Sequence, residues 1–205
     1  MDVRFLTSAF GQDQYPPPDF PEIAFAGRSN VGKSSLLNTL VNRRNIAKTS
    51  SRPGRTQAIN FFLLDRKLYL VDLPGYGFAK VPIKIKRTWQ KMVETYLKTR
   101  PNLKVVVVII DIRRGAERDD LDLLEWLAYH GISSLVVLTK SDKLSRSQAR
   151  LKAKETTDVI KDVCPHKPIL FSAKTKDGLD QLWASLNNIC FTDFTSPLFH
   201  PARKA

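Results

Sequence analysis

The chain has 205 residues, of which 42% are hydrophobic, 26% charged and 9% aromatic. This composition is typical of an ordinary soluble globular protein and excludes disordered, collagenous and membrane classes.

Only two cysteines occur, Cys164 and Cys190. Two are too few for a disulfide framework or a cysteine-based zinc site, so we expect a reducing, cytoplasmic compartment. The longest apolar run, 105–110, is far shorter than the ~20 residues of a membrane span, and the N-terminus lacks a signal pattern. We therefore expect no integral membrane contact.

Positive charge is concentrated in one part of the chain. The sequence contains 33 Lys and Arg against 20 Asp and Glu, a net charge of +13. Residues 43–104 hold 15 basic and 3 acidic side chains, a net of +12, whereas the rest of the chain holds 18 and 17. Such a run can be a solvated face, but clustered Lys and Arg favour a polyanionic partner because binding it releases counterions. The charge alone fits RNA or an anionic lipid surface.

The first elements of the chain precede a regular alternation. Residues 1–21 are predicted to form an extended surface arm, because Tyr15-Pro16-Pro17-Pro18 cannot continue a helix or a central strand. Apolar runs then predict strands at 22–26, 60–64, 67–71, 104–111, 134–139 and 167–171. Apolar residues at helical spacing predict helices from residue 35 onward and over 85–96, 119–129, 145–164 and 179–189, with a capping box of Ser145 and Gln148 in the fourth.

The order of these elements predicts an α/β fold. Residues 105–110 are β-branched throughout, which is typical of a strand that helices cover on both faces. The alternation favours a three-layer, doubly wound, mostly parallel sheet of about six strands. Only Asp65-Arg66 separates two of the strands, so these should form a hairpin and give the sheet one antiparallel strand. We expect one domain at 22–191 with a tail at 192–205, and a monomer because no long heptad pattern occurs.

A phosphate-binding loop is the strongest motif. Residues 27–34, Gly-Arg-Ser-Asn-Val-Gly-Lys-Ser, match G-x-x-x-x-G-K-S between a predicted strand and a predicted helix. The glycines let backbone N–H groups face phosphate oxygens. Lys33 can place a cation between the terminal phosphates, Ser34 can offer a hydroxyl to Mg²⁺, and the dipole of the following helix adds to the attraction. The sequence therefore predicts a nucleoside triphosphate site with Mg²⁺ as cofactor.

Two further strand ends predict which base is bound. Thr139-Lys140-Ser141-Asp142 ends a predicted strand, at the edge where open α/β sheets bind ligands. Asp142 can accept hydrogen bonds from the ring N–H and the exocyclic amine of guanine, whereas adenine has no such donor pair. The stem of Lys140 can cover the purine face, and a backbone N–H of Phe171-Ser172-Ala173 can donate to the guanine carbonyl. These residues favour GTP over ATP.

Residues between these motifs can sense the third phosphate. Asp72, in Asp72-Leu73-Pro74-Gly75, can hold Mg²⁺ through water, and Gly75 lets its backbone N–H approach the γ-phosphate. Thr56 can complete the Mg²⁺ shell only while the third phosphate is present, so hydrolysis would release its loop. Each of these is a common loop residue by itself, and the prediction depends on their order after the phosphate-binding loop.

Together these motifs resemble the translation-factor class of P-loop GTPases. More closely, they resemble the EngB family (also called YihA or YsxC), bacterial GTPases of large ribosomal subunit assembly. The specific strings are Arg-Pro-Gly-Arg-Thr-Gln at 52–57, followed by Asn60-Phe61, and Val-Asp-Leu-Pro-Gly-Tyr-Gly at 71–77. The resemblance covers about 22–191 and implies a Ras-like G domain there.

The resemblance also implies a site and a role. Mg²⁺ would lie on Ser34 and Thr56, beside Asp72. The partner would be the large ribosomal subunit or its precursor, and the family is described as needed for normal cell division and septation, which could follow indirectly from defective ribosomes. The implied nucleotide contacts are Gly27, Arg28, Ser29, Asn30, Val31, Gly32, Lys33, Ser34, Gly54, Arg55, Thr56, Gln57, Ala58, Asp72, Leu73, Pro74, Gly75, Thr139, Lys140, Ser141, Asp142, Phe171, Ser172 and Ala173.

Catalysis is expected to rest on charge neutralisation and positioning by Lys33, Thr56 and Gly75. After Gly75, where Ras-type enzymes have a water-orienting glutamine, this chain has Tyr76, so we expect slow hydrolysis. Asn30 matches the asparagine with which related K⁺-stimulated GTPases hold a potassium ion. This match suggests K⁺ as a second cofactor, although Asn30 can equally cap its loop.

The basic segment 43–104 includes both predicted switch regions and the helix after the second one. We therefore expect the nucleotide to change the affinity for ribosomal RNA, with phosphate contacts from Lys80, Lys84, Lys86, Arg87 and Lys91.

Two alternative functions stay open. One is a P-loop ATPase or kinase. The other is a GTPase at the membrane or the division machinery whose basic stretch meets anionic lipid.

Overall fold

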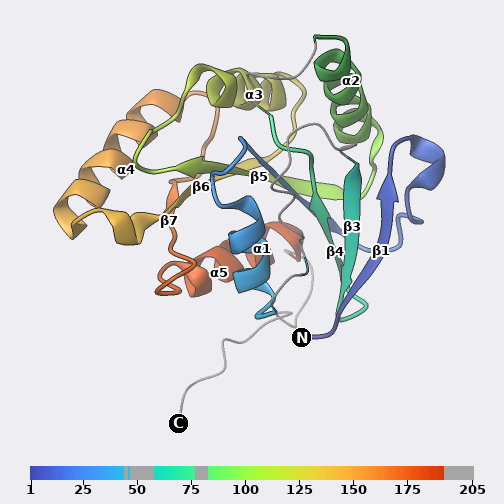
Figure 1. The fold of residues 1–205 in the computed structure, drawn as a ribbon, viewed down its shortest axis with the longest axis horizontal. Helices are drawn as coiled ribbons and strands as arrows, with labels where there is room; N and C mark the ends of the chain where they lie inside the picture. Colours follow the sequence, from blue (N-terminus) through green and yellow to red (C-terminus); the bar gives the residue numbers. More distant parts are fainter. Residues whose placement is uncertain (44–45, 47–57, 77–82, 192–205) are drawn as a thin grey trace.

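The computed structural model describes residues 1–43, 46, 58–76 and 83–191, with the backbone alone at 83–87 and 89. In these residues one sheet has seven strands, flanked by helices (Figure 1). The strands are β1 (Val3–Ala9), β2 (Glu22–Gly27), β3 (Ile59–Leu64), β4 (Leu68–Asp72), β5 (Leu103–Asp111), β6 (Ser134–Thr139) and β7 (Ile169–Leu170). The helices are α1 (Lys33–Leu40), α2 (Ile83–Thr99), α3 (Arg118–Tyr129), α4 (Arg146–Ile160) and α5 (Leu179–Cys190), with 3-10 turns at Gln12–Gln14 and Ser141–Lys143.

The sheet is parallel except at one strand. Its order is β1-β3-β4-β2-β5-β6-β7. β2 pairs in parallel with β4 and β5, and β5, β6 and β7 continue in the same direction. β3 runs antiparallel to both of its neighbours, β1 and β4. The predicted α/β fold with one antiparallel strand is confirmed.

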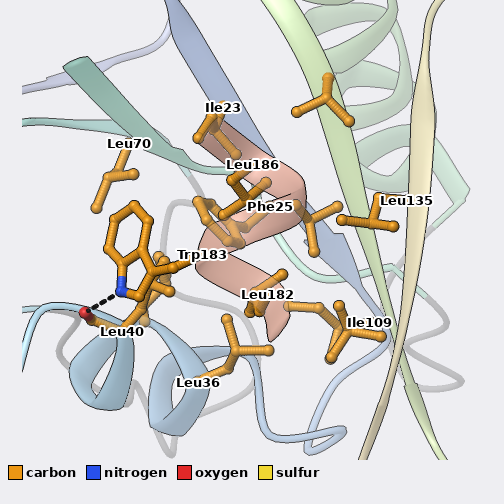
Figure 2. Packing of buried hydrophobic residues seen from close by; sticks show 14 of the residues in the cluster. Ile23, Phe25, Leu36, Leu40, Leu70, Ile109, Leu135, Leu182, Trp183 and Leu186 are labelled. Atoms are coloured by element: carbon orange, nitrogen blue, oxygen red, sulfur yellow. Dashed lines mark hydrogen bonds between the residues drawn. The ribbon is translucent and has the colours of Figure 1, made fainter. Parts of the chain in front are cut away.

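Helices cover both faces of the sheet (Figure 1). On one face α1 packs on β2 and α5 packs on β5. On the opposite face α3 packs on β5 and β6 and α4 packs on β7, and α2 contributes to the same core. Alternate residues of β5 therefore enter opposite cores, which is why its apolar run is unbroken. Figure 2 shows the first core, where the Trp183 indole of α5 lies against α1 and donates a hydrogen bond to the Leu40 carbonyl at 3.2 Å.

The predicted hairpin between β3 and β4 forms, but three residues rather than two separate its strands, because Leu64 pairs with Leu68. Asp65 and Arg66 have φ of 46° and 53°, left-handed values typical of a tight hairpin turn. The Lys67 N–H donates to the Leu64 carbonyl at 2.9 Å and closes the turn.

The first strand, β1, is absent from the predicted elements. Residues 1–21 are predicted to form a surface arm, whereas Val3–Ala9 pairs with β3 as the edge strand of the sheet. The Phe5 ring packs edge-on against Phe62 of β3 at 5.6 Å. The sequence signal is weak because an edge strand needs only one buried face, and its partner lies more than fifty residues away.

Several other boundaries differ from prediction. Helix α4 ends at Ile160 rather than at 164, and β7 is two residues long rather than five. Helix α1 starts at Lys33 rather than at 35, and α2 covers 83–99 rather than 85–96. The predicted capping box of Ser145 and Gln148 is present at the start of α4. Among the described residues, no helix has the length and apolarity needed to cross a membrane.

Candidate functional site

The predicted phosphate-binding loop joins the end of β2 to the start of α1. A Cβ at Gly27 would lie 2.9 Å from the Ile109 carbonyl oxygen of β5, so only glycine lets the two strands approach here. Gly32 has φ of 105° and precedes the first residue of α1, Lys33. The loop thus directs the N-terminus of α1 towards the carboxyl edge of the sheet, where an anion gains from the free N–H groups.

The loop after β4 meets this phosphate-binding loop. The Lys33 ammonium forms an ion pair with the Asp72 carboxylate, and both side chains are largely buried. A Cβ at Gly75 would lie 3.4 Å from both the Gly27 carbonyl oxygen and the Ser29 hydroxyl. Leu73 continues the strand direction, since its N–H donates to the Phe25 carbonyl at 3.0 Å. The structure therefore brings the predicted residues 27–34 and 72–75 together.

Oxygen donors suited to Mg²⁺ lie in this part of the chain. Ser34 is in the first turn of α1, and Asp72, 9% exposed, ends β4. A carboxylate and a hydroxyl are hard ligands of the kind that Mg²⁺ prefers, so the donor set fits the predicted ion. Thr56 lies outside the described residues, as do Gly54, Arg55 and Gln57. Ala58, the last member of that predicted group, is buried just before β3.

Tyr76 makes hydrogen bonds both to the predicted phosphate-binding loop and to α3. Its N–H donates to the Gly27 carbonyl at 3.3 Å, and its carbonyl accepts from the Ser29 N–H at 3.2 Å. Its hydroxyl donates to the Asp120 carboxylate of α3 at 2.8 Å. Burial and the charge of Asp120 raise the pKa of Tyr76 well above its usual value, so the phenol stays neutral. Burial also raises the pKa of Asp120 to about 6, although the hydrogen bond from Tyr76 acts against it.

The predicted base-binding residues lie at the ends of β6 and β7. The Thr139 hydroxyl donates to the Val31 carbonyl at 2.5 Å, and the Lys140 ammonium donates to the Asn30 carbonyl at 2.7 Å. The loops predicted to bind the base and the phosphates are therefore in direct contact. Asp142 accepts a hydrogen bond from the Ser172 hydroxyl at 2.8 Å.

The loop after β7 is held by its own backbone. Phe171 is fully buried and Ala173 packs against the core, while the Ser172 hydroxyl accepts from the N–H groups of Lys174 and Thr175 at 3.2 Å. The Ser172 N–H donates to the Asp177 carbonyl at 3.1 Å. The two loops predicted to surround the base thus share one network, with Ser172 at its centre.

Two residues of this region are absent from the predicted set. Asp111 ends β5 and makes an ion pair with Lys140 at 3.0 Å. The available signal was an acidic residue directly after a wholly apolar strand, the same signal that marks Asp72. Gly178 has φ of 78°, and a Cβ there would lie 1.9 Å from the Leu170 carbonyl oxygen. The available signal was an Asp-Gly pair directly before a helix.

We expect Gly178→Ala to lower the free energy of unfolding by about 3 kcal/mol or more, because the β7 backbone must move to admit the methyl group. Gly131→Ala is the matched control. Gly131 also has a positive φ, of 66°, but nothing lies within 4 Å of its Cβ position, so its cost is only about 1–2 kcal/mol. Denaturant unfolding of both variants measures the difference, and equal losses would contradict the role of the close contact.

Four of the five predicted RNA contacts lie outside the described side chains. Lys80 lies outside the described residues, and only the backbone is described for Lys84, Lys86 and Arg87. Lys91 is exposed on α2. The structure therefore describes one of the five side chains.

Comparison with known proteins gives matches over most of the chain. Residues 22–140 match the family model described as 50S ribosome-binding GTPase. A "Probable GTP-binding protein EngB" of Geobacter metallireducens is 52% identical over 184 residues, which is 90% of each chain. The protein of the same name from Bacillus subtilis is 45% identical over 186 residues, 91% of this chain and 95% of its own.

Solved structures give the same result for the fold. A crystal structure of a probable GTP-binding protein engB matches with a TM-score of 0.64 at 25% identity, over 83% of this chain and 99% of that one. Era in complex with MgGDPNP and a segment of 16S ribosomal RNA matches with a TM-score of 0.65 at 20% identity, over 88% of this chain and 59% of Era. The second likeness shows a shared fold only.

Proposed function

Because this chain belongs to the EngB family of GTP-binding proteins and is a GTPase, we propose that it switches between GTP-bound and GDP-bound states during assembly of the large ribosomal subunit. The observation that carries the proposal is the match of residues 22–140 to a family described as 50S ribosome-binding GTPases. The net charge of +12 on residues 43–104 supports an RNA-rich partner. The ATPase alternative does not apply to a member of this family.

Within the site, each loop has a proposed part. The phosphate-binding loop, including Lys33, binds the phosphates. Mg²⁺ would be held by Ser34, Thr56 and Asp72, and the backbone N–H of Gly75 would contact the γ-phosphate. When bound, Mg²⁺ would neutralise charge that develops on the phosphates during transfer. Support comes from the contact between residues 27–34 and 72–75 and from the Lys33–Asp72 ion pair. Residues 139–142 and 171–173 bind guanine, which the contact between Asp142 and Ser172 supports.

The proposed hydrolysis is slow and depends on potassium. Tyr76 is neutral and its hydroxyl is engaged by Asp120, so it is unsuited to activate water. Asn30 adopts φ of 65°, and its carbonyl is bound by Lys140, which leaves its side chain available for K⁺ beside the phosphates. We expect the rate constant of GTP hydrolysis in Tyr76→Phe to stay within about threefold of that of the unmodified chain. We also expect the unmodified chain to hydrolyse GTP faster in KCl than in NaCl. Single-turnover assays measure both. A loss of orders of magnitude in the variant would assign Tyr76 to catalysis, and equal rates in the two salts would remove the K⁺ site.

The proposed ribosome contact includes the basic residues of the second switch region and α2. Neutralising Lys80, Lys84, Lys86, Arg87 and Lys91 should flatten the salt dependence of binding to large-subunit precursors, because fewer counterions are released. Each phosphate contact that is lost should reduce the slope of log K against log salt concentration by roughly 0.7–0.9. The measurement is co-sedimentation of the GTP-loaded protein on sucrose gradients at several salt concentrations.

A matched control removes the same charge elsewhere. Five basic residues in and after α4 are exposed: Arg146, Arg150, Lys154, Lys161 and Lys167. Neutralising them leaves the proposed surface intact, so the slope should stay near that of the unmodified chain. An equal fall in both variants would show that net charge alone governs binding. Sedimentation with membranes rather than with ribosomal particles would favour the alternative of a GTPase at the membrane or the division machinery.

The remaining family features follow from the ribosome role. A protein that acts on ribosomal precursors would work in the cytoplasm, and we propose that it does so as a monomer with its G domain at 22–191. A requirement in cell division and septation would follow indirectly from a shortage of large subunits.

A further inference from the structure

We propose that Asp111 is a positioning residue for guanine recognition, which acts by holding the Lys140 ammonium between the base-binding and phosphate-binding loops. The inference rests on the proposed role of Lys140 and Asp142 at the base. Asp111 belongs to neither the phosphate-binding motif nor the base-binding motif, yet its buried carboxylate positions the Lys140 side chain of the second motif.

The contacts of Asp111 leave little freedom at Lys140. Asp111 is 4% exposed, and its Oδ2 lies 3.0 Å from the Lys140 Nζ. The same Nζ donates to the Asn30 carbonyl of the phosphate-binding loop at 2.7 Å. Lys140 also has φ of 61°, a strained value for a side-chain-bearing residue that turns the chain at the end of β6. One ammonium thus joins three segments: the end of β5, the phosphate-binding loop and the base-binding loop.

Asp111 is itself fixed before any ligand arrives. In the parallel register it stands opposite Thr139, and the Ile112 N–H donates to the Thr139 carbonyl at 3.1 Å. The Arg113 guanidinium donates to both carboxylate oxygens of Asp111, at 3.0 Å to Oδ1 and 2.7 Å to Oδ2. The Arg113 backbone N–H also donates to Oδ1, at 3.1 Å. The carboxylate therefore has a fixed position from which to hold Lys140.

The charge of Asp111 persists despite its burial. Burial alone would raise the pKa of Asp111, but the hydrogen bonds from Arg113 and Lys140 outweigh it and hold the pKa well below its usual value. An ionised carboxylate attracts the ammonium more strongly than a neutral amide can. A free lysine would lose rotamer entropy when it settled along a purine, whereas a lysine already held loses less. Asp111 therefore lowers the entropic cost of closing the site on the base.

The expected signature is weaker guanine nucleotide binding with unchanged chemistry. We expect Asp111→Asn to release a fluorescent GDP analogue about tenfold faster than the unmodified chain. The rate constant for hydrolysis at saturating GTP should stay within about twofold, because the phosphate contacts of Lys33 are not altered. Stopped-flow dissociation and single-turnover hydrolysis measure the two quantities.

A double-mutant cycle tests whether Asp111 acts through Lys140. Lys140→Met removes the ammonium that Asp111 holds, so adding Asp111→Asn to it should speed release by less than about twofold. Full additivity, with another tenfold in the double variant, would overturn the proposal. Asp111→Glu keeps the charge and should restore most of the slow release. If Asp111→Asn does not fold, as judged by thermal unfolding without nucleotide, Asp111→Ser takes its place in the cycle, because it also removes the charge that holds Lys140.

Two controls separate this inference from the site on which it rests. Arg113→Gln removes the guanidinium bonds to the same carboxylate but leaves the Arg113 N–H bond and the Lys140 ion pair, so release should speed up by about threefold at most, less than in Asp111→Asn. Faster release in Arg113→Gln than in Asp111→Asn would indicate a general loosening of the loop and overturn the proposal. Asp142→Asn tests the base site itself. If that variant keeps its guanine preference, the base site is wrong, whereas a changed preference with an additive cycle contradicts only the role of Asp111.

Discussion

Asp142→Asn is expected to lower the affinity for GDP and GTP by about two to four orders of magnitude and to raise the affinity for xanthosine nucleotides. Two charge-assisted hydrogen bonds to guanine are lost, each worth roughly 1.5–3 kcal/mol, and every 1.4 kcal/mol is about tenfold in affinity. The Ser172 hydroxyl donates to Oδ1 of Asp142, an acceptor that asparagine retains. The asparagine amide can then donate to the carbonyl that xanthine carries in place of the guanine amine.

Titration calorimetry with guanosine and xanthosine diphosphates in Mg²⁺ measures the change. Asp158→Asn is the matched control, because Asp158 is an exposed carboxylate of α4 remote from both loops, and the same substitution should leave guanosine binding unchanged. Undiminished guanosine affinity in Asp142→Asn would contradict the assignment of residues 139–142 to the base. A loss for every nucleotide without a gain for xanthosine would point to a collapsed loop instead.

Lys33→Ala is expected to reduce GTP hydrolysis by about two to three orders of magnitude, the usual effect of removing one charge-stabilising group from a phosphoryl-transfer site. Lys33 opens α1 at the N-terminal end, so the lost ammonium stands where the helix dipole and the loop N–H groups converge. Its substitution also leaves the largely buried Asp72 without this cation.

Single-turnover hydrolysis and GTP binding report the two parts of this effect. Lys154→Ala, an exposed lysine of α4, removes the same charge far from the site and should leave both unchanged. Thermal unfolding without nucleotide separates a lost contact from a lost fold. Hydrolysis within about threefold of the unmodified chain would remove Lys33 from the proposed mechanism.

Several features of this protein were predictable because they are local. A helix directly after the phosphate-binding loop follows from the glycines of that loop, although α1 starts at Lys33 rather than at residue 35 as predicted. The β3–β4 hairpin follows from the short separation of the two apolar runs, since only a tight turn can join them. The placement of Asp72 and Asp142 at one edge also follows, because the carboxyl ends of parallel strands share that edge.

The strand β1 and the precise strand ends were not predictable in this way. A run such as Val3–Ala9 becomes a strand because β3 offers a free edge, and that edge is formed by residues from 59 onward. Its own pattern carries little information, since an edge strand has few positions that must be apolar. Tertiary context thus decided the element.

The sequence by itself determined the order of strands and helices from β2 onward and the residues that gather at the carboxyl edge of the sheet, because periodicity, glycine geometry and strand ends act over short windows. Only the tertiary structure decided which distant side chains meet. Lys140 binds Asp111 from 29 positions away and Tyr76 binds Asp120 from 44, and both contacts depend on strand register and on where α3 lies. Register and helix placement arise from packing the whole core at once, so no short window of residues encodes them.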